Sequence, residues 1–566
     1  MIRIEDLTFT YPGAARPTLN HVSLEVEDGD FLAVIGNNGC GKSTLCKTLN
    51  GLIPHFISGD MTGRVLIDGE DTAAMDVGSL AKKVGYVYQD FENQIVRPTV
   101  LDDASFACMN YAMADYEERG GRALDACGLS QKKHDYIWQL SGGQKHLLAL
   151  AGMLALSPKI LILDEPIAQL DPGHAREIYE VLKNLNENHG ITVIVIEHHT
   201  EFIASYCKHA VLMKNGEILW KLPAKEALRR VDELEESNIF PPQITVAAKR
   251  LKEAGVLSPE TKLPTTVAEG EQVFGKLLLR GDYRAAVRPS VRGTKKNVEF
   301  SGITVKYRAV KGDSYPIFND FSLDIHKGEK IALIGSNGAG KTTLMKLMMG
   351  LIRPEAGDVR LDGRETADIA PEELSNRISL VYQNPEEMFI KDTIRGDIEF
   401  AMKMRKVKDY RQRTDELLGM FHLEELADRD GRLLSGGQMR RASLAVGIAL
   451  NPSILLLDEP TANLDIATRK EIIKTLNVLK DVTETVMIAT HDMQLVCDWA
   501  ERIIVLSAGR VIADGDRDAI FSDSHVLNQV GIRPPEIFYM GSRLLSQARC
   551  YTIEEFTDLF ERKGAS

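Results

Sequence analysis

The feature that most constrains the fold of this 566-residue chain is an internal duplication. The stretch GNNGCGKST at residues 36–44 returns as GSNGAGKTT at residues 335–343. The stretch LSGGQ at residues 140–144 returns unchanged at residues 434–438, and LDEP also occurs twice, in the same order. Several elements keep their order and nearly keep their spacing, so chance is not a serious explanation. The sequence therefore predicts two homologous modules in tandem, which agrees with a length too great for one hydrophobic core.

Each glycine-rich stretch follows a short apolar run and precedes a helix-like segment. In that context glycines let backbone N–H groups turn inward around a phosphate, and the helix N-terminus favours an anion. The lysine that follows reaches the β- and γ-phosphates, and the next hydroxyl holds Mg²⁺. The candidate residues are Asn37, Gly39, Gly41, Lys42, Ser43 and Thr44 in the first module, and Asn337, Gly338, Gly340, Lys341, Thr342 and Thr343 in the second.

Two further apolar runs, typical of buried strands, end in a pair of acids. An α/β sheet places its ligand-binding groups at the carboxyl ends of its strands. Asp164 and Asp458 fit a carboxylate in the outer shell of Mg²⁺, and Glu165 and Glu459 fit a base that orients the attacking water. A buried strand that ends in two acids would be costly as mere structure, so the pattern predicts catalysis.

The charge balance argues against a broad nucleic-acid-binding surface, because such a surface needs a basic face and this chain has a net charge of −13. Residues 276–296 are an exception, with seven basic residues and one acid. Glycine and proline interrupt this stretch, so we interpret it as a solvated linker. A contact with anionic lipid headgroups is the alternative.

Cysteine usage and hydropathy predict a soluble intracellular protein. The seven cysteines lack the spacing of metal-binding or disulfide motifs. No apolar run approaches the length of about 18 residues that a membrane-spanning helix needs. The N-terminus runs directly into strand-like alternation and has no apolar signal segment.

Together with a Val-Tyr-Gln segment and a strand that ends in histidine, these motifs resemble those of the ATP-binding cassette (ABC) family over nearly the whole of both halves. The resemblance implies an ATPase that uses ATP and Mg²⁺, with an α/β fold of two P-loop NTPase nucleotide-binding domains. Each domain is expected to carry a helical subdomain with the LSGGQ signature, an antiparallel β subdomain and a small C-terminal extension. We expect the first nucleotide-binding domain at residues 1–222, its extension and the basic linker at 223–297, the second domain at 298–515 and its extension at 516–566.

The resemblance also implies roles outside the phosphate loops. Gln89 and Gln383 match the glutamine that contacts Mg²⁺ and water and senses a transporter partner. Tyr11 matches the aromatic residue that stacks on adenine, and Tyr307 is its counterpart in the second half.

In the family, the signature does not serve the ATP of its own module but caps the γ-phosphate on the facing module. By this resemblance Ser141, Gly142 and Gly143 close on the site of Lys341, and Ser435, Gly436 and Gly437 close on the site of Lys42. Asp171 and Asp465 match an aspartate that communicates across the dimer. One chain then supplies two composite sites in head-to-tail order.

The two halves depart from each other at two points, so we expect their sites to hydrolyse ATP unequally. The second half has the usual Thr-His-Asp around His491, whereas the first half has Glu-His-His. Counting along each strand selects His198 over His199 as the counterpart of His491. The residues after the signature are Met-Arg-Arg in the second half and Lys-His-Leu in the first, which suggests weaker capping by the first signature.

Cys40 lies inside the first phosphate loop. A thiol at a helix N-terminus tends toward a lowered pKa and higher reactivity, so alkylation is expected to block the first site unless ATP protects it. The simpler interpretation is that Cys40 is a small residue at a permissive position.

ATP hydrolysis needs something to drive, and the leading hypothesis is a membrane transporter whose spanning subunits are separate chains. The sequence VYQNPEE at residues 381–387 and a Pro-Pro segment after each module resemble the energy-coupling factor ATPases. This resemblance implies uptake of a vitamin or metal ion at the cytoplasmic face of the membrane. It also implies two integral membrane partners, a scaffold subunit and a substrate-binding subunit. A scaffold helix would dock beside the glutamine segment, with Gln94, Ile95, Val96, Met388 and Phe389 as candidate contacts.

The alternative function is that of a soluble tandem-cassette ATPase that acts on ribosomes or nucleic acid. The acidic charge, the absence of a long charged helical hairpin in the linker and the repeated extension argue against it. A DNA-repair ATPase would need zinc-binding cysteine clusters or a long coiled coil, and the sequence has neither.

Overall fold

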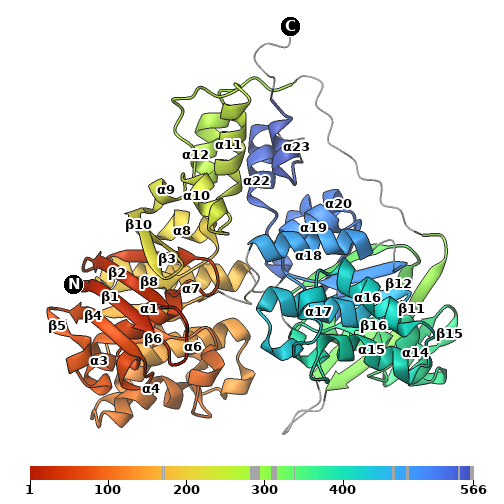
Figure 1. Cartoon of the computed structure of the whole chain (residues 1–566), viewed down its shortest axis with the longest axis horizontal. Helices are drawn as coiled ribbons and strands as arrows, with labels where there is room; N and C mark the ends of the chain where they lie inside the picture. Colours follow the sequence, from red (N-terminus) through yellow and green to blue (C-terminus); the bar gives the residue numbers. More distant parts are fainter. Residues whose placement is uncertain are drawn as a thin grey trace. The chain divides into compact units, whose positions relative to one another are not determined.

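The chain forms two compact units in a computed structural model, which describes residues 1–167, 170, 172–280, 293–307, 315–336, 338–461, 466–479, 483–545 and 549–560. Unit 1 comprises Met1–Tyr283, Tyr539–Ser546 and Phe556–Ser566, and unit 2 comprises Arg284–Phe538 and Gln547–Glu555. Most of unit 1 is coloured red to yellow-green in Figure 1, and most of unit 2 green to blue.

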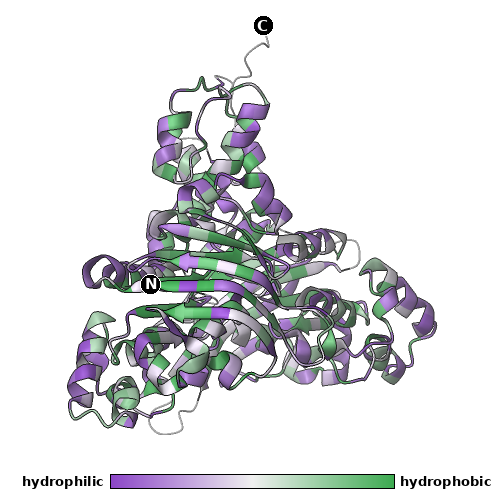
Figure 2. Ribbon diagram, turned by 60° about the vertical axis from the view of Figure 1, so that its left-hand side comes forward, coloured by the Kyte–Doolittle hydropathy of each residue, from purple (hydrophilic) through white to green (hydrophobic). Residues whose placement is uncertain are grey.

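The centre of unit 1 is a six-stranded sheet in the order β10-β9-β3-β8-β7-β6, parallel except for β10. Its strands are β3 (Phe31–Gly36), β6 (Val84–Val87), β7 (Ile160–Asp164), β8 (Thr192–Ile196), β9 (His209–Lys214) and β10 (Glu217–Pro223). The strands β3, β6, β7 and β8 are buried along their whole length, as expected for parallel strands covered on both faces. Figure 2 shows many strands of the chain coloured as hydrophobic along much of their length.

A second sheet of unit 1 is antiparallel, in the order β2-β1-β4-β5. It consists of β1 (Ile2–Thr10), β2 (Leu19–Val26), β4 (Asp60–Ile67) and β5 (Glu70–Asp71). The strand β1 has an irregular register at Glu5 and Asp6, where Asp6 takes a φ of 48°. This bulge inserts one extra residue, so that Leu7 and Phe9 face the same core as Ile2 and Ile4.

Helices cover both sheets of unit 1 and build the helical subdomain. They are α1 (Lys42–Leu49), α2 (Leu52–His55), α3 (Val77–Lys83), α4 (Val100–Asn110), α5 (Tyr116–Ala126), α6 (Gly142–Leu154), α7 (Pro172–His189) and α8 (Thr200–Tyr206). The start of α4 is fixed by Thr99, whose side chain accepts a hydrogen bond from the Asp102 N–H.

Unit 2 repeats this architecture, which confirms the predicted duplication at the level of the fold. Its parallel sheet has the order β16-β17-β18-β13-β19-β20, and its antiparallel sheet has the order β12-β11-β14-β15. The strands are β11 (Lys296–Tyr307), β12 (Tyr315–His326), β13 (Lys330–Gly335), β14 (Ala356–Leu361), β15 (Arg364–Glu365), β16 (Ile378–Val381), β17 (Ile454–Asp458), β18 (Thr485–Ala489), β19 (Arg502–Ser507) and β20 (Arg510–Gly515). The helices are α13 (Lys341–Met348), α14 (Pro371–Arg377), α15 (Ile394–Met404), α16 (Tyr410–Met420), α17 (Gly436–Ile448), α18 (Ile466–Leu479) and α19 (Met493–Trp499).

The segments after the two modules are helical, as predicted. They comprise α9 (Ala224–Ala227), α10 (Val231–Glu236), α11 (Gln243–Glu253) and α12 (Val267–Phe274), and then α20 (Arg517–Phe521), α21 (Ser524–Val530), α22 (Glu536–Leu544) and α23 (Ile553–Thr557). Within unit 1, the ring of Phe274 packs against the rings of Phe556 and Phe560, with centroids 5.0 and 6.0 Å away. The last described residues of the chain therefore close the core of the first extension. Among the described residues, no helix is both long and apolar enough to cross a membrane.

Replacing Phe274 by alanine is expected to destabilise unit 1 by about 3–5 kcal/mol, because it removes a fully buried ring from this aromatic cluster. The measurement is the urea midpoint of the unfolding transition of unit 1. The matched control is Phe56→Ala, whose ring is 74% exposed and whose loss should leave the midpoint nearly unchanged. Equal midpoints for the two variants would contradict this packing.

Candidate active sites

The two glycine-rich loops have the same backbone conformation, in which φ is 155°, 76° and 103° at Gly36, Gly39 and Gly41 and 156°, 79° and 106° at Gly335, Gly338 and Gly340. Glycine is required at the end of the strand, because a Cβ at Gly36 would lie 2.4 Å from the Met213 carbonyl oxygen. At Gly335 it would lie 2.3 Å from that of Leu506. Each loop then leads directly into a helix, α1 or α13, as a phosphate-binding loop requires.

The lysine of each loop lies buried within the curl. The Lys42 ammonium donates to the carbonyl oxygens of Gly36 at 2.8 Å and Asn37 at 3.0 Å. The Lys341 ammonium donates to the Gly335 carbonyl oxygen at 2.7 Å. A cation held inside a loop of inward-turned N–H groups is the partner that a phosphate group needs. Asn337 lies outside the described residues.

The hydroxyl after each lysine meets the aspartate at the end of the acidic strand. The Thr342 hydroxyl donates to Asp458 at 2.9 Å, and the Ser43 hydroxyl bonds to Asp164. Burial raises the pKa of both carboxyl groups, and a bound cation would oppose this effect by favouring their charged forms. These oxygen donors are the ligands that Mg²⁺ prefers, so the residues present fit a magnesium ion.

The first site has an additional donor that the sequence alone did not indicate. The Tyr86 hydroxyl, from β6, donates to Asp164 at 3.2 Å, whereas the equivalent position in unit 2 is Leu380. The predicted adenine-stacking residue Tyr11 is half-buried and lies 3.2 Å from the Thr44 hydroxyl. Its counterpart Tyr307 ends β11, and its side chain is outside the described part of the chain.

Glu165 and Glu459 both take a left-handed backbone, with φ of 51° and 47°. Such a conformation costs a glutamate roughly 1–2 kcal/mol and is retained where the surrounding structure fixes it. In each unit the glutamate N–H donates to the carbonyl of the last residue of the neighbouring strand, Ile196 or Ala489. This bend turns the carboxylate away from the strand and toward the phosphate loop.

The partners of the two glutamates differ. In the first site Glu165 accepts from the Gln89 amide at 2.8 Å and lies 3.1 Å from the His198 ring. Burial raises the pKa of Glu165, but its bond to His198 and the nearby positive charges outweigh this effect and hold the pKa below its usual value. Glu165 is therefore a carboxylate at neutral pH.

Glu459 accepts from the Thr490 hydroxyl at 3.2 Å and from the His491 N–H at 3.3 Å, while the His491 ring nitrogen lies 3.6 Å away. That nitrogen is closer to the Lys341 ammonium, at 3.2 Å. Burial dominates here and raises the pKa of Glu459 to about 7. The two candidate bases thus differ in charge near neutral pH.

The structure places His198 rather than His199 beside Glu165. His199 is exposed and faces Glu201 at 3.6 Å. The preceding residue, Glu197, is buried and accepts the N–H groups of both histidines as well as the Tyr179 hydroxyl. The sequence analysis did not predict that Glu197 anchors this segment. A signal was present, because Glu197 stands at the position that Thr490 occupies in the second half.

Each signature begins a helix through a capping box. The Ser141 N–H donates to the Gln144 side chain, and the Ser435 N–H donates to Gln438 in the same way. Gly143 and Gly437 are needed for packing, since a Cβ would lie 2.5 Å from His174 or 2.6 Å from Thr468. A Cβ built at Gly142 or Gly436 would meet no atom of the described residues within 4 Å. Asp171 and Asp465 lie outside the described residues.

The side chains that follow each signature contact residues of the same unit. Arg440 is buried and bonds to backbone carbonyls of unit 2, and Arg441 pairs with Glu471. At the position of Arg440, the first half has His146, whose ring lies 4.3 Å from Phe91 and whose pKa burial lowers to about 4.

The expectation of a reactive Cys40 is wrong in direction. Cys40 is buried, and burial raises the pKa of its thiol above the usual value. The nearby Lys42 charge opposes this effect without overcoming it, so the thiol is protonated at neutral pH.

The two sites are expected to hydrolyse nucleotide unequally and with different pH dependence. With Glu459 replaced by glutamine, turnover at the first site should change little from pH 6 to pH 8, because Glu165 stays ionised. With Glu165 replaced by glutamine, turnover at the second site should rise about tenfold over the same range as Glu459 loses its proton. Steady-state phosphate release measures both profiles. Equal turnover of the two variants at every pH would contradict this difference.

Comparison with known proteins shows which family this chain is similar to. A family model described as ABC transporter matches residues 19–168 and 318–462, and an AAA-domain model matches residues 133–204. A candidate ABC transporter ATP-binding protein of Methanosarcina acetivorans is 32% identical over 551 residues, which cover 94% of this chain and 89% of the relative. One of Caldanaerobacter subterraneus is 32% identical over 554 residues, 96% of each chain.

Among solved structures, CbiO1 of Clostridium perfringens, described as part of the ABC transporter complex CbiONQ, is 31% identical. It covers 42% of this chain and 94% of its own length, with a TM-score of 0.38. The family model alone spans both modules, and the curated relatives span nearly the whole chain. The chain therefore belongs to the ABC transporter family and is an ATP-hydrolysing enzyme with two tandem ATP-binding domains.

Proposed function

We propose that this ATPase is the motor subunit of a membrane transporter of the energy-coupling factor type, which takes up a vitamin or a metal ion. The membrane-spanning parts, a scaffold subunit and a substrate-binding subunit, are separate chains. The observation that carries the proposal is an apolar groove in unit 2, beside the segment that contains Gln383.

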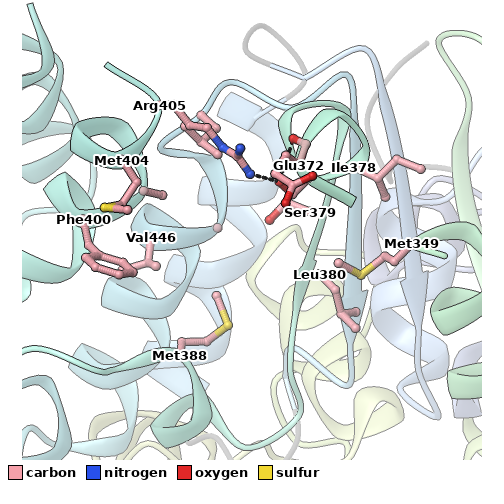
Figure 3. Close-up of a pocket in the computed structure, with 14 residues that line it drawn as sticks. Met349, Glu372, Ile378, Ser379, Leu380, Met388, Phe400, Met404, Arg405 and Val446 are labelled. Atoms are coloured by element: carbon pink, nitrogen blue, oxygen red, sulfur yellow. Dashed lines mark hydrogen bonds between the residues drawn. The ribbon is translucent and has the colours of Figure 1, made fainter. Parts of the chain in front are cut away.

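The groove has a volume of about 490 Å³ and lies between the helical subdomain and the parallel sheet. Figure 3 shows methionine and other apolar side chains from β16, α15 and α17 around it. They are Leu380 of β16, Phe400 and Met404 of α15 and Val446 of α17, and they are joined by Met349, which follows α13, and by Met388, which ends the turn Pro385–Met388. Methionines fit irregular apolar surfaces, and a groove of this kind accepts the apolar face of a partner helix.

The rim of the groove carries polar groups that would orient such a helix. The Arg405 guanidinium donates to the Ser375 hydroxyl at 2.7 Å, and Glu372 lies on the same side (Figure 3). Met404, which lines the groove, is 69% exposed. Exposed apolar side chains around a groove are typical of a protein-binding surface.

The groove communicates with the ATP site through a short segment. Met388 lines the groove and ends a short helical turn (Pro385–Met388) that begins two residues after Gln383. Occupancy of the groove would thus shift the segment that carries Gln383.

Of the other predicted contacts, Val96 is exposed and Ile95 packs on the core of unit 1. Phe389 is buried against Gly431, and Gln94 bonds to the backbone of Tyr86 and Tyr88. Phe389 and Gln94 therefore support their loops, and neither is among the residues that line the groove of unit 2.

Each ATP site is proposed to be completed by the signature of the other half. The open faces of Gly142 and Gly436 support this assignment, because a phosphate can approach the helix N-terminus there. Mg²⁺ would be held by Ser43, Gln89 and Asp164 in the first site and by Thr342, Gln383 and Asp458 in the second. It would neutralise charge on the transferring phosphoryl group.

Replacing Met404 by glutamate is expected to abolish co-isolation with small integral membrane proteins, because a charge in the groove would oppose an apolar helix. Basal ATP hydrolysis should stay within about twofold, since Met404 is exposed and lies outside the ATP site. The measurement is mild-detergent purification of the tagged chain from its native cells.

Leu219→Glu is the matched control, since Leu219 is a partly exposed apolar residue of unit 1. It should keep the membrane partners. Co-sedimentation of the wild-type chain with ribosomes, without membrane proteins, would overturn the proposal in favour of the soluble alternative.

A further inference from the structure

We propose that Arg440 is a positioning residue of the second ATP site, which ties the signature helix to the backbone of Gln383 and Glu459. The inference rests on the role of Glu459 as the base of ATP hydrolysis and does not depend on which partner the transporter motor serves. Arg440 itself touches neither substrate nor the reacting atoms.

Arg440 projects from α17 into the α/β core of unit 2. One guanidinium nitrogen donates to the Tyr382 carbonyl oxygen at 2.9 Å. The other donates to the carbonyl oxygens of Gln383 at 2.7 Å and Glu459 at 3.5 Å. A single side chain therefore joins the signature helix to the loops that follow β16 and β17.

Burial of the Arg440 charge makes this link costly, and the planar shape of its guanidinium group makes the link specific. The side chain is 3% exposed, and burial lowers the pKa of its guanidinium to about 10, opposed by the charges of Glu459 and Asp458. The planar fork of arginine can reach two loops at once, which a lysine cannot do. An apolar side chain would fill the space without desolvating a charge.

The first unit lacks the corresponding link. His146 stands at the same position on α6, but neither ring nitrogen has a hydrogen-bond partner among the described residues. The loop after β6 is instead held by Gln94, whose side chain bonds to the Tyr88 N–H and the Tyr86 carbonyl. Glu165 is held by the side chains of its own site, Gln89 and His198.

The two units therefore differ in the contacts that position their candidate bases. A shift of the signature helix in unit 2 moves the backbone of Glu459 and Gln383 with it, because Arg440 bonds to both. In unit 1 the signature helix contacts its glutamine loop through the Lys145–Glu92 ion pair at 2.7 Å and through packing of the His146 ring on Phe91, with no hydrogen bond from His146 among the described residues. When a signature binds nucleotide, its helix therefore acts directly on the base of its own unit in unit 2, through Arg440. The described part of unit 1 has no such direct link.

The test replaces Arg440 by histidine, the residue of the first half, in the wild-type chain and in the Glu165→Gln chain. We expect kcat in the Glu165→Gln chain to fall tenfold or more, on the order expected for a displaced catalytic group. The Kd for a fluorescent ATP analogue at the second site should stay within about twofold, because the phosphate loop is untouched. Arg440→Lys should lose less kcat than Arg440→His, because lysine keeps the positive charge and can still donate to one of the two loops.

Arg395→His is the control on the same subdomain, since its exposed pair with Asp415 contributes little. It should leave kcat and Kd unchanged within about twofold. A kcat for Arg440→His within twofold of its parent in both chains would overturn the proposal. A parallel loss of kcat and nucleotide affinity, with no gain from lysine, would also overturn it and indicate a purely structural role.

Discussion

The structure of each half depends on the parallel order of its central sheet, which brings the phosphate loop and the acidic strand to one edge. In unit 1, β3 pairs with β8 and β8 pairs with β7, so all three strands end at the same side. Lys42 begins the helix that follows β3, Asp164 ends β7 and Glu165 follows it, and the residues after β8 include the histidine. The same pairing recurs in unit 2. Buried Val, Ile and Leu fix this sheet, and the chemistry of the site follows from where its strands end.

Within that common frame, a few substitutions make the two sites unequal. The first site holds Glu165 with a glutamine and a histidine and keeps it ionised. The second buries Glu459 beside Thr490 and raises its pKa to about 7. The signature helices also differ, since Arg440 bonds to the glutamine loop of unit 2, whereas the His146 ring packs at a tilt against Phe91 of unit 1. Duplication has preserved the fold while the polar contacts of the two sites have diverged.

The sequence predicted the elements of the site well, because their spacing repeats and their strand context is local. The phosphate loops, the acidic strands and His198 could all be placed in this way. Contacts between distant segments could not be predicted. The bond of Arg440 to the Gln383 carbonyl joins residues 57 positions apart, and the support of Glu197 by Tyr179 depends on how α7 packs. For Cys40, the helix terminus indicated a low pKa, but the depth of burial decided the opposite.

The central claim is that each half carries an ATP site and that the candidate bases of the two sites differ in charge near neutral pH. Photolabelling with an azido-ATP after vanadate trapping, followed by peptide mapping, tests this claim directly because it reports the product trapped in each half. Both halves should bind the nucleotide on ice. At pH 6 the trapped ADP should lie mainly in the first half, where Glu165 remains a carboxylate. Equal trapping in the two halves at pH 6 would contradict the account.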